Sequence, residues 1–341
     1  WIKAEALALG FSDCVIAKPD AQAELPRFKK YLELGYHGDM HFLTENLEKR
    51  ADPTLLVQGT KSIICVRMDY LVAVPEPRLV PFAPNSAIIA RYARGRDYHK
   101  VMRGRLKTLS QKIKAKVGDF ESRPFADSAP IFEKSLAENA GMGWVGKHTL
   151  LIHKTSGSFF VLGELFTSLE LPFDQATTKH CGSCSACIDI CPTQAIVEPY
   201  LLDARKCIAY LTIEFQGIIP EELRRGIGNR VFGCDDCQLI CPWNSFAKTT
   251  SIEDFHPRHN LDQVDLLELW DWDETTFLTK TEGSPLRRTG YQSFMRNIAI
   301  GLGNAPYSEK IIETLTRTRI DYDEIVQVHI DWAIAQQQRK Q

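Results

Sequence analysis

Residues 181–192 read CGSCSACIDICP. Three cysteines two residues apart, followed by Cys191 and Pro192, have the spacing of [4Fe–4S] ligands in proteins that carry two clusters. Three such thiolates can bind three corners of a cubane cluster, whereas the cysteine beside the proline binds a second cluster. The spacing therefore predicts another set of cysteines downstream.

That second set lies at residues 234–242, which read CDDCQLICP. It repeats the last three cysteines of the first run, but Val231 stands where a first cysteine would be. Cys207 is available to supply the missing ligand. We therefore assign one cluster to Cys181, Cys184, Cys187 and Cys241, and the other to Cys191, Cys207, Cys234 and Cys237.

Two other interpretations of these cysteines, zinc sites and disulfides, agree less well with their spacing. Structural zinc sites would use two separate Cys-x2-Cys pairs each, and a triple run that ends in Cys-Pro does not have that pattern. Disulfides are typical of small secreted domains with scattered cysteines. Cys14 and Cys65 lie outside both runs, and we expect them to pack as small apolar residues.

Composition indicates an ordinary globular chain of 341 residues, 44% hydrophobic and 25% charged, with a net charge of −2. No apolar run reaches the length of a membrane span, so we expect no membrane association. No signal peptide is visible, and reduced thiolates suit the cytoplasm, which is where we expect the protein.

The charges are unevenly distributed along the chain. Ten Lys or Arg and one acid lie between Arg91 and Lys116, whereas eight acids and one Arg lie between Ser251 and Glu274. Tyr98 and His99 are interleaved with the basic residues, which favours a polyanionic partner, with Arg94 and Arg103 as first candidates and Arg287 and Arg288 next. The alternative is a solvated helix face.

Hydrophobic periodicity and turn residues predict an α/β first half and a helical end. The expected helices are 25–34, 98–117 and 131–140, ending at Gly35, Gly118 and Gly141. The expected strands are 62–68, 87–92 and a short one ending at 125–127, with a hairpin of 150–152 and 159–166.

Further motifs accompany the cysteines: KRADP (49–53), RYARGRDYH (91–99), DSAPIFE (127–133), AGMGWVGKHTL (140–150), GNR (228–230) and GCDDCQ (233–238). With the cysteines, these motifs closely resemble the epoxyqueuosine reductase family, which performs the last step of queuosine biosynthesis in tRNA. The resemblance runs from the first helix to Trp243, and more weakly beyond it.

The resemblance implies three regions. Residues 1–171 would form an α/β cobalamin-binding catalytic domain, 172–250 a ferredoxin-like domain with two [4Fe–4S] clusters, and 251–341 a short α-helical C-terminal region. It implies cobalamin as a cofactor, epoxyqueuosine in the anticodon loop of tRNA as substrate, an external low-potential electron donor, and a monomer.

The resemblance also implies residue roles. Asp127 matches the general acid, and Arg50 matches an arginine that lies on the cobalamin. The other residues that match the cofactor cavity are Asp97, Tyr98, His99, Lys147, Cys234 and Asp235. Some family members carry a cysteine where this chain has Ala90, so that cysteine cannot be essential for the activity of this chain.

The residue chemistry is compatible with these roles. Removing an epoxide oxygen takes two electrons, which need a cofactor, and a proton from a general acid. To hold that proton near neutral pH, Asp127 would need a raised pKa.

Each role has a structural alternative. Asp127 could cap the helix that follows Pro130. Arg50 could be a surface ion-pair residue, His99 a surface residue, and Lys147 a capping or solvated lysine, while Trp144 is expected in the core. Alternative functions are a cobalamin-dependent reductive dehalogenase and a two-cluster electron-transfer protein.

Overall fold

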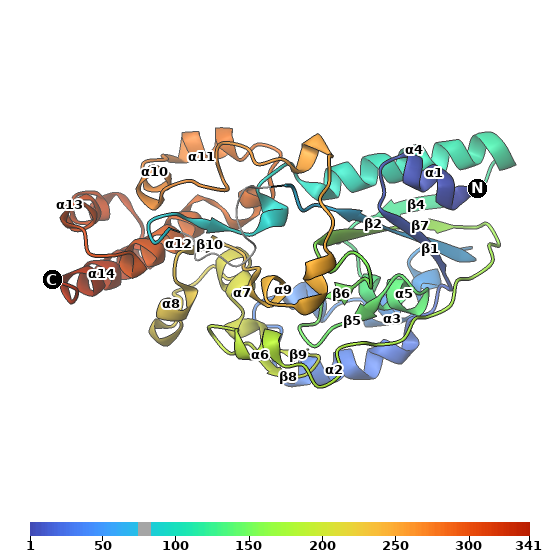
Figure 1. Cartoon of the computed structure of the whole chain (residues 1–341), viewed down its shortest axis with the longest axis horizontal. Helices are drawn as coiled ribbons and strands as arrows, with labels where there is room; N and C mark the ends of the chain where they lie inside the picture. Colours follow the sequence, from blue (N-terminus) through green and yellow to red (C-terminus); the bar gives the residue numbers. More distant parts are fainter. Residues whose placement is uncertain (74–82) are drawn as a thin grey trace.

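A computed structural model describes residues 1–73 and 83–341 of the chain. Figure 1 shows an elongated molecule with a sheet at one end and the C-terminal helices at the other. The sheet has the strand order β1-β2-β7-β4, and every pairing in it is antiparallel. Its strands are β1 (Asp13–Ala17), β2 (Ser62–Asp69), β4 (Ser122–Phe125) and β7 (Phe160–Thr167).

Helices cover both faces of this sheet. Alternate residues of β2 point to opposite faces, so Ile64 and Val66 join the core under α4, while Ile63 and Cys65 join the core under α5. In Figure 1, α1 lies beside α4 on one face and α5 lies on the other. The helices of this part are α1 (Ile2–Ala8), α2 (Leu25–Glu33), α3 (Leu47–Ala51), α4 (Tyr98–Val117) and α5 (Glu133–Asn139).

Helix α4 has the bounds that the sequence predicts. The Asp97 carboxylate accepts a hydrogen bond from the His99 amide at its start, and Gly118, with φ +88°, ends it. Buried Met102, Leu106 and other residues at helical spacing face the sheet. The helix therefore fixes Tyr98 and His99 in its first turn.

Two expected strands differ in the structure. The hairpin prediction is wrong: β6 (Leu151–Ile152) pairs with β5 (Trp144–Val145), while β7 lies between β2 and β4. The expected strand at 87–92 is only β3 (Ile88–Ile89), parallel to β10 (Arg230–Phe232). It ends early because the Arg91 amide donates to the Asp235 carboxylate, at 2.8 Å, instead of extending the ladder.

The cysteine region is compact and poor in regular structure. One-turn helices α6 and α9 contact each other and carry Cys187 and Cys237. Gly233, directly before Cys234, has φ +69°, and a Cβ there would lie 2.7 Å from the Ala90 Cβ, so only glycine fits. Its elements are α6 (Ala186–Asp189), α7 (Ile208–Ile213), α8 (Glu221–Ile227), α9 (Asp236–Leu239), β8 (Ile196–Glu198) and β9 (Leu201–Leu202).

The C-terminal helices share a core with residues of the cysteine region. Ile208 and Phe232 pack in one cluster with Phe294 and Ile298, and buried Arg296 donates to the backbone carbonyl of Leu211. The domain boundaries at 171 and 250 stay a prediction, and the packing runs across the second of them. The helices are α10 (Leu266–Trp270), α11 (Glu274–Lys280), α12 (Tyr291–Asn304), α13 (Glu309–Thr318) and α14 (Glu324–Gln338).

No helix in the two described ranges is long and apolar enough to cross a membrane.

Candidate cofactor and active site

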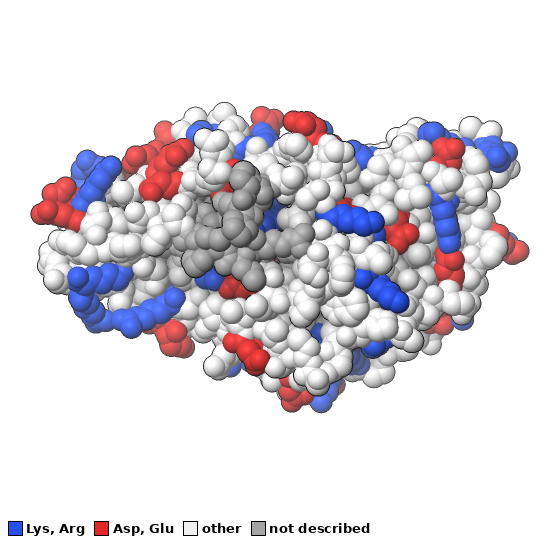
Figure 2. All heavy atoms as spheres, viewed as in Figure 1, with Lys and Arg blue, Asp and Glu red and all other residues white. Residues whose placement is uncertain are grey.

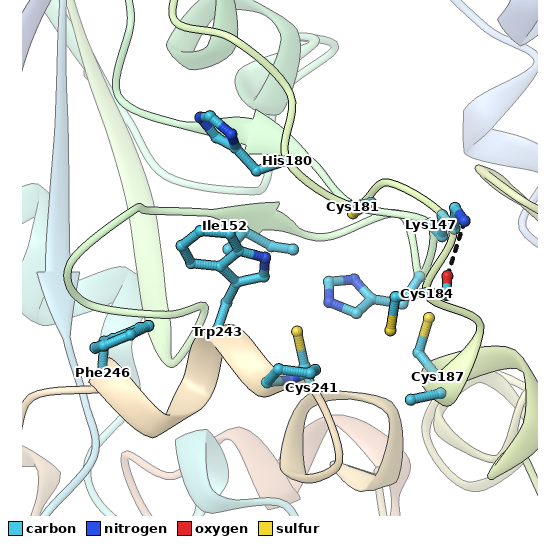
Figure 3. Close-up of a pocket in the computed structure, with 12 residues that line it drawn as sticks. Lys147, Ile152, His180, Cys181, Cys184, Cys187, Cys241, Trp243 and Phe246 are labelled. Atoms are coloured by element: carbon cyan, nitrogen blue, oxygen red, sulfur yellow. Dashed lines mark hydrogen bonds between the residues drawn. The ribbon is translucent and has the colours of Figure 1, made fainter.

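The four cysteines assigned to the first cluster line one cavity. Its volume is about 290 Å³, and its walls include Cys181, Cys184, Cys187 and Cys241. In Figure 3 the thiols of Cys184, Cys187 and Cys241 point into one space beside Trp243. Cys241 reaches this space from the second cysteine run, as the crossed ligand assignment requires.

Lys147 secures the backbone of this cavity. Its ammonium group donates to the carbonyls of Gly182 at 2.7 Å and Cys184 at 2.8 Å, and Figure 3 draws the bond to Cys184. Gly182 has φ +50°, so the lysine holds a turn that favours glycine. The lysine that the resemblance places near cobalamin therefore contacts the first cysteine loop.

The other four cysteines form a second, adjacent group. Burial raises the pKa of the Cys207 thiol, and nearby Cys191 adds to the rise. Burial also raises the pKa of Cys237, with Cys234 and Cys207 adding to it. The Cys191 sulfur accepts a hydrogen bond from the Ala195 amide at 3.3 Å. Cys191, Cys207, Cys234 and Cys237 thus lie near one another, and their assignment to the second cluster stays a prediction.

A [4Fe–4S] cluster and a single metal ion place different demands on their cysteine ligands. Within the described ranges, no group of three or more His, Cys, Asp or Glu is arranged to hold a metal ion. A cubane cluster differs from a single ion because its four thiolates bind four different irons. Cys14 and Cys65 are buried in the sheet, as expected for apolar packing, and Trp144 is fully buried, also as expected.

The second site is a chain of polar side chains around Asp127. The Asp127 carboxylate accepts a hydrogen bond from the Tyr98 hydroxyl at 2.7 Å and lies 3.1 Å from His99 Nε2. His99 Nδ1 lies 2.7 Å from the Asp97 carboxylate, and the His99 ring stacks on Tyr98 with centroids 4.0 Å apart. The Asp127 side chain is half exposed, whereas that of His99 is 16% exposed.

This geometry places the proton on His99. Burial by itself would lower the pKa of His99, but the two carboxylates raise it to about 9. Burial opposes the shift at Asp127 too, yet hydrogen bonds from His99 and Tyr98 hold the pKa of Asp127 below its ordinary value. The expectation of a raised Asp127 pKa is therefore wrong, because two donors stabilise the carboxylate.

Asp127 does not cap the following helix. Helix α5 begins at Glu133, and its N-cap, Phe132, makes no side-chain cap hydrogen bond. Asp127 has φ +57°, a left-handed conformation that costs energy for a residue other than glycine. Its amide donates to the Glu133 carboxylate at 2.6 Å. The capping alternative is wrong, and the turn leaves the carboxylate directed at α4.

Aromatic contacts join the Asp127 site to the cysteine region. The Tyr92 ring lies 5.8 Å from Tyr98 and 6.4 Å from Phe232, measured between centroids. Phe232 ends β10, two residues before Cys234. Buried Asp235 accepts a hydrogen bond from the Arg91 amide, so the second cysteine run is fastened to the segment that leads into α4.

Arg50 is buried and not a surface ion-pair residue. It is 7% exposed, and its guanidinium lies 5.7 Å from the Phe28 ring centroid. One of its terminal nitrogens donates to the Phe42 carbonyl at 3.1 Å, while the buried Nε has no partner among the described residues. Burial lowers the pKa of Arg50. An unpaired buried donor of this kind is suited to a polar ligand.

Much of the basic stretch serves the fold. Arg94 is 3% exposed and donates to the Ile89 carbonyl. The prediction that Arg94 contacts a polyanionic partner at the surface is therefore wrong. Arg103 donates to the His99 carbonyl, and Arg96 pairs with Asp254 of the acidic segment at 3.1 Å. On the face in Figure 2, Lys and Arg alternate with Asp and Glu. The two charged segments thus partly neutralise each other.

Three charged residues lie near Asp127 that the sequence did not predict to be its neighbours. Glu133 bonds the Asp127 amide, Glu164 is fully buried behind it, and Arg288 contributes to the lowered pKa of Asp127. Glu133 ends the 127–133 motif, but the other two come from distant parts of the chain, and no local pattern indicates their position.

Two family descriptions match the chain. Residues 180–244 match "4Fe-4S double cluster binding domain", and residues 50–128 match "Epoxyqueuosine reductase QueG, DUF1730". The chain is 51% identical to the epoxyqueuosine reductase of Pseudomonas aeruginosa, over 96% of this chain and 91% of that protein. The chain belongs to the epoxyqueuosine reductase family.

Solved structures of epoxyqueuosine reductases have the same fold. The Bacillus subtilis enzyme, with its catalytic aspartate loop swung out of the active site, is 27% identical and covers 98% of this chain and 89% of its own, with a TM-score of 0.90. An epoxyqueuosine reductase with an epoxyqueuosine-modified tRNA-Tyr stem loop is 26% identical and covers 99% and 98%, with a TM-score of 0.85.

Proposed function

We propose that this chain reduces epoxyqueuosine to queuosine in the anticodon loop of tRNA, with Asp127 as the proton donor to the departing oxygen. As a member of the epoxyqueuosine reductase family, the chain is a tRNA-modifying oxidoreductase. The observation that carries the proposal is the half-exposed Asp127 carboxylate, held between the Tyr98 hydroxyl and the His99 ring.

The cysteines fit two [4Fe–4S] clusters with the crossed ligand sets. Four of the cysteines line one cavity, and the second set lies beside the first. Buried Cys187 and partly buried Cys237 lie near each other across the contact between α6 and α9. Clusters in these positions would carry single electrons inward, from the exposed Cys184 loop to the segment of Cys234.

A cobalamin would be held between the Asp127 site and the second cluster. The unpaired Nε of Arg50 is a donor suited to a corrin amide, and Tyr98, His99 and Asp127 present polar atoms beside the aromatic contact to Phe232. Asp97, Cys234 and Asp235 would support this site through the segments that they hold, whereas Lys147 holds the first cysteine loop. When bound, the cobalamin would supply the two electrons that the reduction needs.

The residues of the chain account for one of the two protons, and the second would come from solvent. Conversion of an epoxide to an alkene consumes two electrons and two protons and releases water. At neutral pH the His99 imidazolium holds a proton 3.1 Å from Asp127. The Asp127 carboxyl, protonated from His99, would deliver it to the departing oxygen, and the Tyr98 hydroxyl would stabilise the carboxylate left behind.

The remaining partners are proposals as well. We expect a cytoplasmic monomer that takes electrons from an external low-potential donor. The first-cluster cavity opens beside Trp243 and Phe246, and Phe246 is 55% exposed, so electrons would enter at this end of the molecule.

The direct test uses protein with reconstituted clusters and added cobalamin, a chemical reductant, and an epoxyqueuosine-containing tRNA stem loop. Mass spectrometry of the nucleosides should show queuosine in amounts above the enzyme concentration. Bound clusters and cobalamin without any queuosine would contradict the proposal, whereas a stem loop of unmodified sequence is the control for product assignment.

A further inference from the structure

The loop that carries Asp127 is held by a second acid. The Asp127 amide donates to Glu133 Oε1 at 2.6 Å, at the point where the backbone has φ +57°. This bond closes the loop onto the first residue of α5. Because a left-handed aspartate is unfavourable without such support, the Glu133 oxygen stabilises the turn that directs the carboxylate to Tyr98 and His99.

Glu133 itself contacts a completely buried acid. Glu164 lies in the middle of β7, opposite Cys65 of β2 and Phe125 of β4, and it is 0% exposed. Neither of its carboxylate oxygens receives a hydrogen bond from a donor of the described chain. Helix α5, which begins at Glu133, packs against β7, and burial together with the Glu133 carboxyl raises the pKa of Glu164. Two neighbouring carboxyl groups, one of them fully buried, do not readily ionise together, which favours a proton held between them.

We propose that Glu133 and Glu164 share a proton and that Glu133 is a positioning residue that latches the Asp127 loop against α4. The catalytic meaning of the latch rests on the proposed function, but the latch itself does not. In the Bacillus subtilis relative the catalytic aspartate loop has been observed swung out of the active site, so a loop at this place has two positions in that protein.

Near neutral pH, the environment of Glu133 and Glu164 favours a single proton on the two carboxyl groups. Burial raises the pKa of Glu133 to about 7 and that of Glu164 well above its ordinary value. Above pH 7, Glu133 is thus ionised and accepts both the Asp127 amide and the Glu164 proton. The other titratable groups that face the pair or lie beside it are Asp127, Tyr98, His99, Lys134 and Cys65.

The position of Asp127 can be read from His99 without any substrate. His99 owes part of its raised pKa to the Asp127 carboxylate at 3.1 Å. NMR titration of ¹³C-labelled histidine in the full chain with clusters, assigned by His99→Gln, measures this pKa. Glu133→Ala removes the latch, and we expect the His99 pKa to fall by at least one unit and single-turnover reduction to slow about tenfold or more.

Glu133→Gln is the rescuing variant, since its amide oxygen still accepts the Asp127 N–H and its NH₂ group donates to Glu164. We expect its His99 pKa to stay within about half a unit of the original value. Glu313→Gln, at an exposed position of α13, is the matched control. An unchanged His99 pKa in Glu133→Ala overturns the latch, and so does an equal fall in Glu133→Gln. A fall confined to Glu133→Ala in a chain that reduces no epoxyqueuosine keeps the latch and rejects only the function.

The shared proton can be tested separately, by the pH dependence of thermal stability. A raised pKa in the folded state stabilises the protein below the unfolded value of 4.5, and this contribution is lost as pH rises through about 7. The melting temperature of Glu133→Gln, relative to the original chain, should therefore increase between pH 5 and pH 8. A difference that does not change with pH would overturn the shared proton.

Discussion

Replacing Asp97 by Asn tests where the catalytic proton is stored. Asn caps helices about as well as Asp, so α4 should keep its first turn while the charge next to His99 Nδ1, at 2.7 Å, disappears. The chain thus permits a change of electrostatics with little change of fold. The Tyr98–Asp127 hydrogen bond is not touched by the substitution.

The size of the effect follows from the two carboxylates. A rise of the His99 pKa from 6.5 to about 9 corresponds to about 3 kcal/mol of proton affinity. Asp127 and Asp97 share this contribution, so loss of one charge should lower the His99 pKa by about one unit, or about 1.4 kcal/mol. We expect the alkaline limit of single-turnover reduction to move from about pH 9 to about pH 8.

The raised pKa of His99 also determines how Asp97→Asn changes the thermal stability of the protein at different pH values. Because the folded pKa of His99 is raised, its contribution is present below pH 6.5 and is lost as pH rises through about 9. Asp97→Asn should therefore cost stability at pH 6 and much less at pH 10, measured by thermal melts of the protein with intact clusters.

Asp273→Asn is the matched control, since Asp273 caps α11 by accepting the Thr276 amide. It should leave both the alkaline limit and the His99 pKa unchanged. If Asp97→Asn lowers the His99 pKa by NMR but leaves the alkaline limit at pH 9, His99 is not the proton store and the reasoning fails.

Three further predictions concern the clusters and the substrate surface. Cys207→Ser should lower the iron content from about eight to about four per chain, with the remaining EPR signal that of the cluster on the Cys181 run; unchanged iron would refute the ligand assignment. Lys147→Met removes two hydrogen bonds to the first cysteine loop, so a chelator should extract iron from that cluster several times faster, and equal rates would show that the contact is dispensable. Charge reversal at exposed Lys100 and Lys107 should weaken tRNA binding at low salt and reduce its salt dependence, whereas the same reversal at Lys310 of α13 should not, and equal losses would move the tRNA site away from α4.

The sequence predicts features that depend on local spacing. The cysteine runs predict ligand sets because neighbouring thiolates must reach corners of one small cluster. Cys241 lines the same cavity as the first cysteine run, and the ligand sets stay a prediction. Helix α4 is predicted residue for residue, because Asp97 and Gly118 are strong start and stop signals.

Features that depend on distant contacts are not predictable in this way. The run at 159–166 reads as a hairpin arm, but its partners β2 and β4 lie far away in sequence. The lowered pKa of Asp127 comes from α4, about thirty residues earlier, and the acid pair behind it includes Glu164 of β7. The sequence of the basic stretch likewise predicts an exposed, charged surface, because no local pattern shows that Arg94 is buried.

The central claim, that Asp127 donates the proton, is tested most directly by single-turnover reduction of an epoxyqueuosine stem loop by Asp127→Asn. Asn can keep the hydrogen bond from Tyr98 but cannot carry the proton. We predict intact clusters, bound cobalamin that is still reduced, and a rate at least about a hundredfold lower. A rate within a few fold of the original chain, under the same conditions, would contradict the account.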